Sequence, residues 1–270
     1  MLGNRKRRKY AFGNNGFRRQ LCRLFRRELR SLSFLKHFLM TQQRSEWKFL
    51  CSDGQIEMIR SRLSAILAHD PHAEPDGSYT VHSLYFDDYW NSCAAGNESG
   101  NGLRCKYRIR CYGNSSGGLH FERKEKCYGY GSKLSCAISP EEYRNLIAGN
   151  YSEVFWNTEE ILLKKFCTLS MMRFFTPKVI VDYKRTAFVE PAANIRITLD
   201  QDICAAPECS EFLNGSYFNI PILGKNQNIL EVKFDEILPS WLKRMIESLR
   251  LQQTTFSKYY LGRKKLENLL

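Results

Sequence analysis

The sequence lacks the marks of several broad classes of protein. No apolar run approaches the ~18 to 20 residues of a membrane-spanning helix, and the basic N-terminus lacks the uninterrupted apolar core of a secretory signal. The ten cysteines include no CxxC pair and no Cys/His cluster at zinc spacing, and the five histidines are scattered. We therefore expect a cytoplasmic protein, soluble or peripheral at the inner face of a membrane, whose thiols are reduced and mostly buried.

Positive charge is in excess but is unevenly distributed. The net charge is +13, and residues 1–40 hold twelve Lys and Arg and a single acid, Glu28, for a net charge of +11. Residues 41–270 hold 29 basic and 27 acidic residues, so they are close to neutral. Since 43% of the residues are apolar and no internal repeat or linker is evident, we predict one globular domain over 41–270 behind a basic arm, residues 1–40.

The basic arm has the pattern of an amphipathic helix. Phe25 and several leucines could share one helical face, with arginines on the other. Such a helix could dock on an anionic membrane surface or on a membrane-protein partner. Nucleic acid is a less favoured partner. A solvated arm, or a stretch upstream of a start at Met40, is the alternative.

From residue 44 onward, the hydrophobic pattern predicts an α+β domain. Alternating stretches predict strands, and Ser139, Pro140 and Glu142 form a helix start signal of the capping-box type. A stretch rich in Gly, Ser and Asn, residues 113–118, predicts a hairpin turn. The expected strands are 44–51, 79–87, 103–112, 119–126, 177–189, 194–200 and 229–234, and the expected helices are one capped by Asp53 and those near 141–149, 161–175, 241–250 and 257–270.

The stretch 104–110, RCKYRIR, places a cation at every second position. In a strand, alternate side chains point to the same face, so the cations share one face while Cys105, Tyr107 and Ile109 share the other. The second face suits a buried core, and the first face predicts an anionic ligand. The four cations are Arg104, Lys106, Arg108 and Arg110.

The other predicted strands also carry polar side chains on one face. A solvent-exposed outer face is the ordinary explanation for a single strand of this kind. It is less satisfactory for six strands that all carry Lys or Arg. Closure of the sheet into a barrel would turn these faces inward and create a basic tunnel. The further polar positions are Glu46, Lys48, Glu122, Lys124, Lys126, Tyr183, Arg185, Arg196, Thr198, Asp200, Glu231 and Lys233.

Seven segments together carry a family resemblance: SLYFDD (83–88), RCKYRIRCY (104–112), FERKEK (121–126) with Lys133, VDYKRTAF (181–188), NIRITLD (194–200), LEVKF (230–234) and FSKYYLG (256–262). In this order and spacing they resemble the VTC domain, over about residues 42–265. That family comprises polyphosphate polymerases and bacterial relatives within the triphosphate tunnel metalloenzymes, also called CYTH-like proteins. The resemblance implies a closed antiparallel barrel of about eight strands, with flanking helices and a basic tunnel.

The resemblance also implies an activity and the residues that carry it. A polymerase of this kind transfers the γ-phosphate of ATP onto a growing polyphosphate chain, primed by phosphate or pyrophosphate, with Mn²⁺ or Mg²⁺ held by Glu231. The catalytic residues that it implies are Lys48, Arg108, Arg110, Lys124, Arg185 and Lys258. The wider substrate-binding set adds Arg104, Lys106, Glu122, Lys126, Lys133, Tyr183, Arg196, Lys233 and Ser257.

Some of these roles have alternatives. Glu231 could instead relieve the repulsion between neighbouring lysines as a salt-bridge partner. Ser257 could cap the last helix or hydrogen-bond a phosphate. Tyr183 could contact the phosphate chain or support Arg185.

Two departures from the family pattern bear on the kind of activity. Arg44 stands where hydrolytic relatives carry the first acid of their metal site, which disfavours a triphosphate hydrolase. His82 stands where many relatives carry an arginine, and a neutral imidazole there would weaken the phosphate grip. A non-catalytic binder of polyphosphate or another polyanion therefore stays open beside the polymerase.

Overall fold

The alternation in the sequence becomes one antiparallel sheet in the computed structural model of the chain, which describes residues 45–269 except 101, 114–117, 128–129 and 236. These residues fall in a compact unit that begins at Gln42. The predicted arm, residues 1–40, and Arg44 lie outside the described residues.

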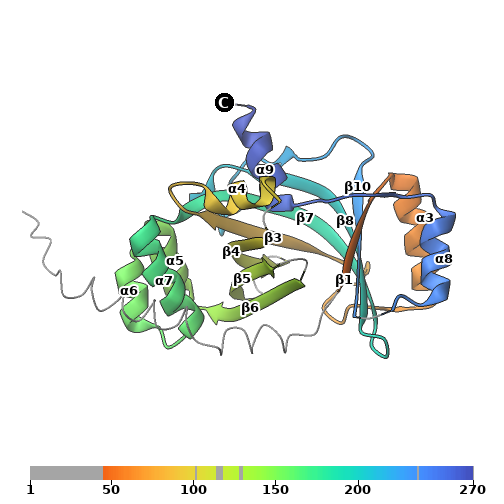
Figure 1. Ribbon diagram of the computed structural model, residues 1–270, viewed down its shortest axis with the longest axis horizontal. Helices are drawn as coiled ribbons and strands as arrows, with labels where there is room; N and C mark the ends of the chain where they lie inside the picture. Colours follow the sequence, from red (N-terminus) through yellow and green to blue (C-terminus); the bar gives the residue numbers. More distant parts are fainter. Residues whose placement is uncertain (1–44, 101, 114–117, 128–129, 236, 270) are drawn as a thin grey trace, which may run out of the picture. The chain divides into compact units, whose positions relative to one another are not determined.

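Eleven strands make up this sheet, in the order β11-β1-β10-β8-β7-β3-β4-β5-β6, while β2 pairs with β7 and β9 pairs with β8 (Figure 1). All the pairs are antiparallel. The strands are β1 (Ser45–Cys51), β2 (Ala68–His69), β3 (Ser78–Asp87), β4 (Leu103–Tyr112), β5 (Leu119–Cys127), β6 (Tyr130–Ile138), β7 (Thr176–Glu190), β8 (Ile195–Ala206), β9 (Ile220–Pro221), β10 (Asn228–Phe234) and β11 (Gln252–Gln253).

The prediction of a closed barrel of about eight strands was wrong. The path of paired strands runs from β11 to β6 and does not return to its start within the described part of the chain. The outer edge of β1 is instead occupied by the segment that leads to the last helix. Gln252 and Gln253 pair with β1, and the Thr254 amide donates to the Lys48 carbonyl over 2.9 Å. Because these bonds use the edge of β1, β6 cannot pair there.

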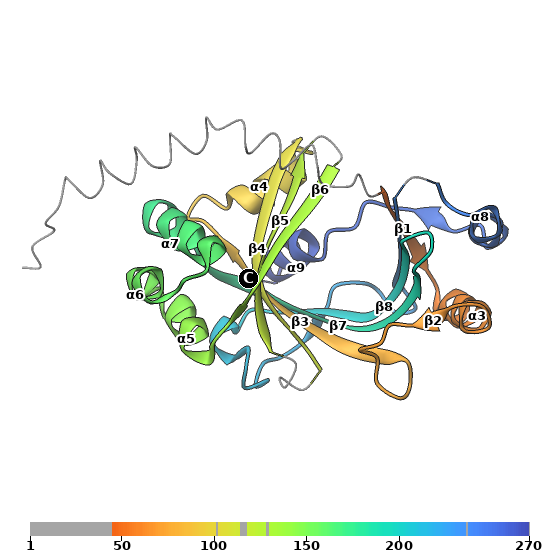
Figure 2. The same ribbon diagram turned by 90° about the horizontal axis from the view of Figure 1, so that it is seen from below.

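The open sheet is nevertheless strongly curved. The Lys124 ammonium on β5 lies 3.6 Å from a carboxylate oxygen of Glu46 on β1. These two strands are six places apart in the sheet, so a flat sheet would separate them by roughly 29 Å. The side chains meet because the sheet curls, and we call its concave side the inner face. Figure 2 shows strands β4 to β6 and strands β8 and β1 on two sides of α9 (Lys258–Glu267).

Helices cover the outer face of the sheet in two groups (Figure 1). Near one end, α3 (Asp53–Ser64) and α8 (Ser240–Ser248) bury Ile56 and Leu242 against β1, β8 and β10. Near the other, α5 (Pro140–Ala148), α6 (Tyr151–Asn157) and α7 (Ile161–Arg173) pack on β3 to β5. Phe166 of α7 contacts the rings of Phe86, Tyr107 and Phe121 there.

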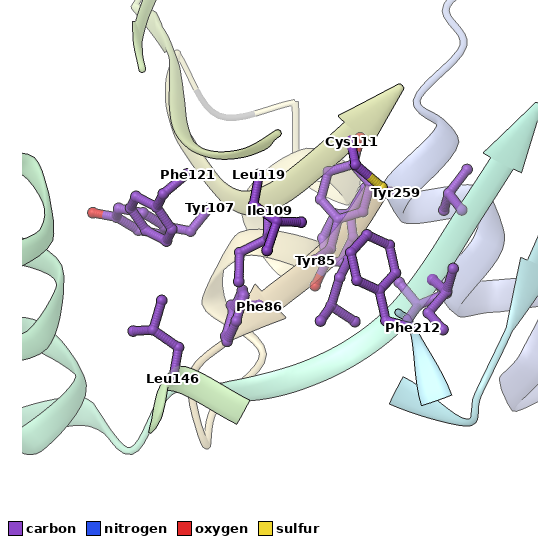
Figure 3. Packing of buried hydrophobic residues seen from close by; sticks show 14 of the residues in the cluster. Tyr85, Phe86, Tyr107, Ile109, Cys111, Leu119, Phe121, Leu146, Phe212 and Tyr259 are labelled. Carbon is purple, nitrogen blue, oxygen red and sulfur yellow. The ribbon is translucent and has the colours of Figure 1, made fainter. Parts of the chain in front are cut away.

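The two faces predicted for RCKYRIR agree with this core. Tyr107 and Ile109 are buried on the outer face among the aromatic side chains (Figure 3), whereas Arg108 points to the inner face. The predicted start signal is also confirmed, because Ser139 and Glu142 cap α5 reciprocally. At α3 the prediction was wrong by one residue: Ser52, not Asp53, is the cap.

The last helix rests on the inner face and closes one end of it. Gly262 permits this close approach, since a Cβ atom there would lie 3.3 Å from that of Ala205. The buried Asp87 carboxylate fixes the helix from β3, because it accepts the Tyr259 hydroxyl and the amides of Cys93 and Ala94 in α4 (Ser92–Glu98). Lys258, the first residue of α9, thereby reaches the centre of the inner face.

Two further observations concern the predicted class of protein. No helix in the described part of the chain has both the length and the apolar content to cross a membrane. The eight cysteines whose side chains the structure describes are all free, and five of them are buried.

Candidate functional site

The register of the strands gathers the predicted site residues on the inner face. Residues directly opposite each other in an antiparallel pair share a face. The strand pairs align Lys48 with Glu231, Arg185 with Asp200, and Arg108 with Glu122. The same pairings place these residues on that face: Glu46, Tyr79, Ser83, Tyr85, Lys106, Arg110, Lys124, Lys133, Arg196, Thr198 and Lys233.

Glu122 on β5 holds two of the cations. It accepts from the Arg108 Nε over 2.7 Å, and its other oxygen lies 3.1 Å from the Lys133 ammonium. Burial of Glu122 disfavours its charge, but Arg108, Arg110 and Lys133 outweigh that effect and lower its pKa to about 2. Glu122 is therefore ionised at neutral pH and acts as a fixed brace between β4 and β6.

Asp200 on β8 holds a second pair. Arg185 donates to both of its oxygens, over 2.6 and 2.8 Å, and the Lys258 ammonium of α9 lies 2.6 Å away. Burial opposes ionisation, yet Arg185 and Lys258 lower the pKa of Asp200 to about 2. The ring of Tyr183 lies 4.6 Å from the same ammonium and 5.0 Å from the guanidinium. Tyr183 thus supports both cations by cation–π contact.

Glu231 on β10 is the third brace. It contacts the Lys48 ammonium at 3.3 Å and that of Lys233 on its own strand. Although burial works in the opposite direction, these two lysines hold the pKa of Glu231 well below its usual range. Lys48 also reaches Glu46 over 3.2 Å and the Phe256 carbonyl over 3.0 Å. Burial would lower the pKa of Lys48, but Glu231 and Glu46 raise it, so this lysine stays charged.

Two cations on β4 have only neutral partners among the residues that the structure describes. Arg110, 6% exposed, donates to the Ser83 hydroxyl over 3.0 Å and to the Tyr183 hydroxyl over 3.1 Å. Lys106 donates to Asn97 over 3.0 Å and to Ser257 over 2.7 Å. Burial, opposed by Tyr85 and helped by neighbouring cations, lowers the pKa of Lys106 to about 8.

Lys124 is nearly as poorly compensated. Its one ion pair with a described residue is the 3.6 Å contact to Glu46. Burial, opposed by Glu46, lowers the pKa of Lys124 to about 8. The inner face therefore carries a surplus of positive charge, concentrated between β4, β5 and β1. An anion that replaced the missing carboxylates would relieve it.

The remaining predicted site residues lie toward the ends of the strands. Arg196 pairs with Asp70 over 2.6 Å and donates to the Tyr79 hydroxyl over 3.0 Å. Arg104 and Lys126 stand opposite each other on β4 and β5, beyond Lys106. Ser257 accepts from the Tyr260 amide over 3.3 Å, so it caps α9 and also holds Lys106.

His82 was expected from the sequence to weaken phosphate binding, but its side chain does not point to the inner face of the sheet. His82 lies on the outer face of β3, where its Nδ1 is 3.0 Å from Asp182. Tyr217 donates its hydroxyl to the same carboxylate over 2.7 Å. Since Ser83 and Tyr85 are the neighbours of His82 that face inward, the imidazole at position 82 does not point to the inner face.

Sequence reasoning did not assign a site role to Asp200 or Tyr85. Asp200 was recognised only as part of a polar face, although its spacing from Arg196 in NIRITLD placed it there. Tyr85 was not assigned a role because it lies among apolar residues in the stretch SLYFDD. Its spacing from Ser83 was the signal, but the face of β3 becomes known only from the pairing of Ser83 with Arg110.

The carboxylates of the inner face suit a hard divalent cation that takes its remaining ligands from other oxygen atoms. The described residues contain no group of three or more His, Cys, Asp or Glu that could hold a metal. Glu46 and Glu231 do approach each other, both contacting Lys48. Mg²⁺ usually takes one or two carboxylates and completes its shell with substrate oxygens and water, and Mn²⁺ also prefers such oxygen donors. These two carboxylates fit that need.

Comparisons with known proteins agree with the curved basic sheet. The family model of the VTC domain matches residues 43–267. An adenylyl cyclase candidate from Hippeastrum with a dominant triphosphatase activity has a TM-score of 0.52 at 12% identity, covering 83% of this chain and 96% of its own. An adenylate cyclase candidate from Bacillus halodurans has a TM-score of 0.47 at 12% identity, covering 80% and 95%. No curated protein matches. The first likeness shows that the two chains share a fold.

The braces make stability dependent on acid pH. Because the folded-state pKa of Glu122 is lowered to about 2, its contribution is complete above about pH 4.5 and is lost as the pH falls toward about 2. We expect Glu122→Gln to lower the free energy of unfolding by about 3 kcal/mol near neutral pH and by much less near about pH 2. Urea unfolding at a series of pH values measures this difference.

The exposed Glu247 offers a matched control for this series. It forms only a loose surface pair with Lys243 at 3.9 Å, so Glu247→Gln should change the stability by less than about 0.5 kcal/mol at every pH. A Glu122→Gln deficit that stayed constant down to the lowest pH would contradict the brace.

Proposed function

The chain belongs to the VTC domain family, and we propose that it is a metal-dependent polyphosphate polymerase that transfers the γ-phosphate of ATP onto a growing polyphosphate chain. The observation that supports this best is the surplus of positive charge at Arg110, which is buried, and at Lys106 and Lys124, which are half-buried. Cations that are withdrawn from water with few or no carboxylate partners are costly in the free protein. A ligand with many closely spaced negative charges provides the missing compensation.

A linear phosphate chain suits the distribution of these cations. The cations of the inner face stand on neighbouring strands, β4 and β5 on one side and β1 and β10 on the other, and the two sides meet where Lys124 contacts Glu46. Internal phosphates of such a chain carry about one negative charge each, and arginine can grip two phosphoryl oxygens at once. A small isolated anion would engage only a part of this surface.

The transfer itself needs little covalent help from the protein. The terminal oxygen of the chain attacks the γ-phosphorus of ATP, the bond between that phosphorus and the bridging β,γ-oxygen breaks, and ADP leaves. Charge accumulates on the phosphoryl oxygens during this step, so positioned cations lower its barrier. Arg108 and Arg185 are suited to this task because their carboxylate braces fix the guanidinium groups in advance.

Glu231, assisted by Glu46, would hold the divalent metal in this proposal. A metal held there would supply positive charge that neutralises the reacting phosphates. The lysines between these carboxylates would then turn toward the phosphate chain. Lys48 is the residue placed to do so, since it contacts both carboxylates.

The direct test is turnover by the purified full-length protein. With ATP, Mn²⁺ and a trace of pyrophosphate, we expect ADP release together with a ladder of lengthening polyphosphate on a gel. Orthophosphate without polymer would instead establish a hydrolase of the same fold. Binding of polyphosphate without any turnover would establish a receptor.

The role of Glu231 can be separated from substrate binding. We expect Glu231→Gln to abolish polymer formation, since the metal loses its main carboxylate, while polyphosphate binding falls by less than about tenfold. Glu247→Gln serves as the control, because its carboxylate lies on the exposed face of α8. Unchanged polymer formation by Glu231→Gln would refute the metal-binding role.

Arg110 provides a test of the positive surplus. We expect Arg110→Ala to weaken polyphosphate binding about 10- to 100-fold, while the ion pairs of Glu122 with Arg108 and Lys133 remain in the folded variant. The matched control is Arg123→Ala on the outer face of β5, where Arg123 pairs with Glu125. Calorimetric titration with polyphosphate decides the matter, and equal affinities for the two variants would contradict the proposed surface.

A further inference from the structure

Tyr85 occupies the middle of the inner face and has no assigned role. It stands directly opposite Arg108 on the neighbouring strand, and its hydroxyl accepts a hydrogen bond from the Arg108 Nη1 over 3.0 Å. Its ring lies 5.0 Å from that of Tyr259 in α9, and Figure 3 shows both rings among the packed side chains. With 5% of its surface exposed, Tyr85 is held between the core and the cations.

The charges around Tyr85 are almost all positive. From β4 it faces Lys106, Arg108 and Arg110. From β5, Glu122 reaches Arg108 and braces it. Among the neighbouring charges, the cations of β4 therefore have the largest electrostatic effect on Tyr85.

The other elements around Tyr85 supply no free negative charge. From β7 the residue opposite is Val179, with Tyr183 farther along the strand. From α9 the neighbour is Tyr259, whose hydroxyl is committed to Asp87. Asp87, two residues along β3, is occupied by that hydroxyl and by the amides of α4. Tyr85 is thus a buried phenol in a positive field.

This field changes the acidity of the phenol. Burial alone would raise the pKa of Tyr85, but Arg108 and Arg110 outweigh it and lower the pKa to about 7. Near neutral pH the residue is therefore a mixture of phenol and phenolate. The phenolate supplies part of the negative charge that the inner face otherwise lacks.

We propose that Tyr85 is a proton-linked ligand of the phosphate chain. As a phenolate it pairs with Arg108. When a phosphate chain binds to the same arginines, the phenolate takes up one proton from solvent, and the resulting phenol donates a hydrogen bond to a phosphoryl oxygen. No substrate bond changes in this step, so the only exchange is one proton. The inference rests on the phosphate binding of the proposed function and adds a pH control to it.

The sign of the effect follows from linkage. Since binding adds a proton to Tyr85, the affinity for polyphosphate must fall as the pH rises through the range in which the free residue ionises. A single linked proton limits the slope to about tenfold per pH unit. Lys106 and Lys124 also titrate near pH 8, so a tyrosine-specific signal is required to separate their contribution.

The test uses the near-ultraviolet absorbance of tyrosinate. In the free full-length protein we expect this band to rise with a midpoint near pH 7 and to shrink when long-chain polyphosphate is added at constant pH. Tyr85→Phe keeps the ring contact with Tyr259 but should lose the band. Between about pH 7 and about pH 9, the polyphosphate affinity of the wild type should fall several-fold more than that of Tyr85→Phe.

Tyr79→Phe is a closely matched control. The Tyr79 hydroxyl also accepts from an arginine, Arg196 over 3.0 Å, but burial dominates there and raises the pKa of Tyr79. This variant should therefore retain both the band and its loss on binding. A similar effect of the two substitutions would mean that loss of any Tyr–Arg hydrogen bond explains the result, and it would overturn the proposal.

The remaining outcomes separate this inference from the proposed function. If wild type binds polyphosphate but its tyrosinate band is absent or unchanged by binding, the role of Tyr85 fails and the polyphosphate site stands. If wild type binds no polyphosphate at any pH, the proposed function fails first and the proton link with it. The wild-type measurement alone decides between these cases, even if Tyr85→Phe does not fold.

Discussion

The structure depends on burying many positive charges on one face of a sheet without forcing the sheet apart. Like charges repel strongly where water is excluded, and each needs a partner to stay ionised. Three carboxylates meet this need by holding two cations each, and every carboxylate comes from a different strand: Glu122, Asp200 and Glu231. The braces join strands and helix α9 as well as charges, so the same ion pairs build both the fold and the surface.

The open but curved sheet follows from how its ends are used. Segment 252–254 occupies the edge of β1, so closure through backbone pairing with β6 is blocked. The two sides of the curve meet through side chains instead, at Glu46 and Lys124. A contact of this kind can open and reform at little cost, whereas a ladder of backbone bonds cannot. In the proposed function, an extended anion would enter between β1 and β5, where only one ion pair has to be replaced.

Much of this arrangement could be read from the sequence, because strand alternation is a local property. RCKYRIR fixed which side chains of β4 share a face, and the order of seven segments indicated the family. Properties that depend on pairing could not be read in the same way. The register of β3 against β4 decides that Tyr85 faces inward and His82 outward, and no feature of SLYFDD alone specifies it. The pairing of Gln252 and Gln253 with β1 lacks even an alternating pattern, so the predicted barrel closure had nothing local to contradict it.

The cations expected to act on phosphate fall into two physical groups. Arg108, Arg185 and Lys258 are held by carboxylates, so they are fixed in position but have part of their charge already compensated. Arg110 and Lys106 have only neutral partners among the described residues, so an incoming anion gains their full attraction without displacing a carboxylate. In the proposed function, the uncompensated group would account for affinity and the braced group for geometry. A polymerase needs both groups. Fixed and fully neutralised groups alone would contribute too little binding free energy for the phosphate chain. Unbraced groups alone would not align the chain for transfer.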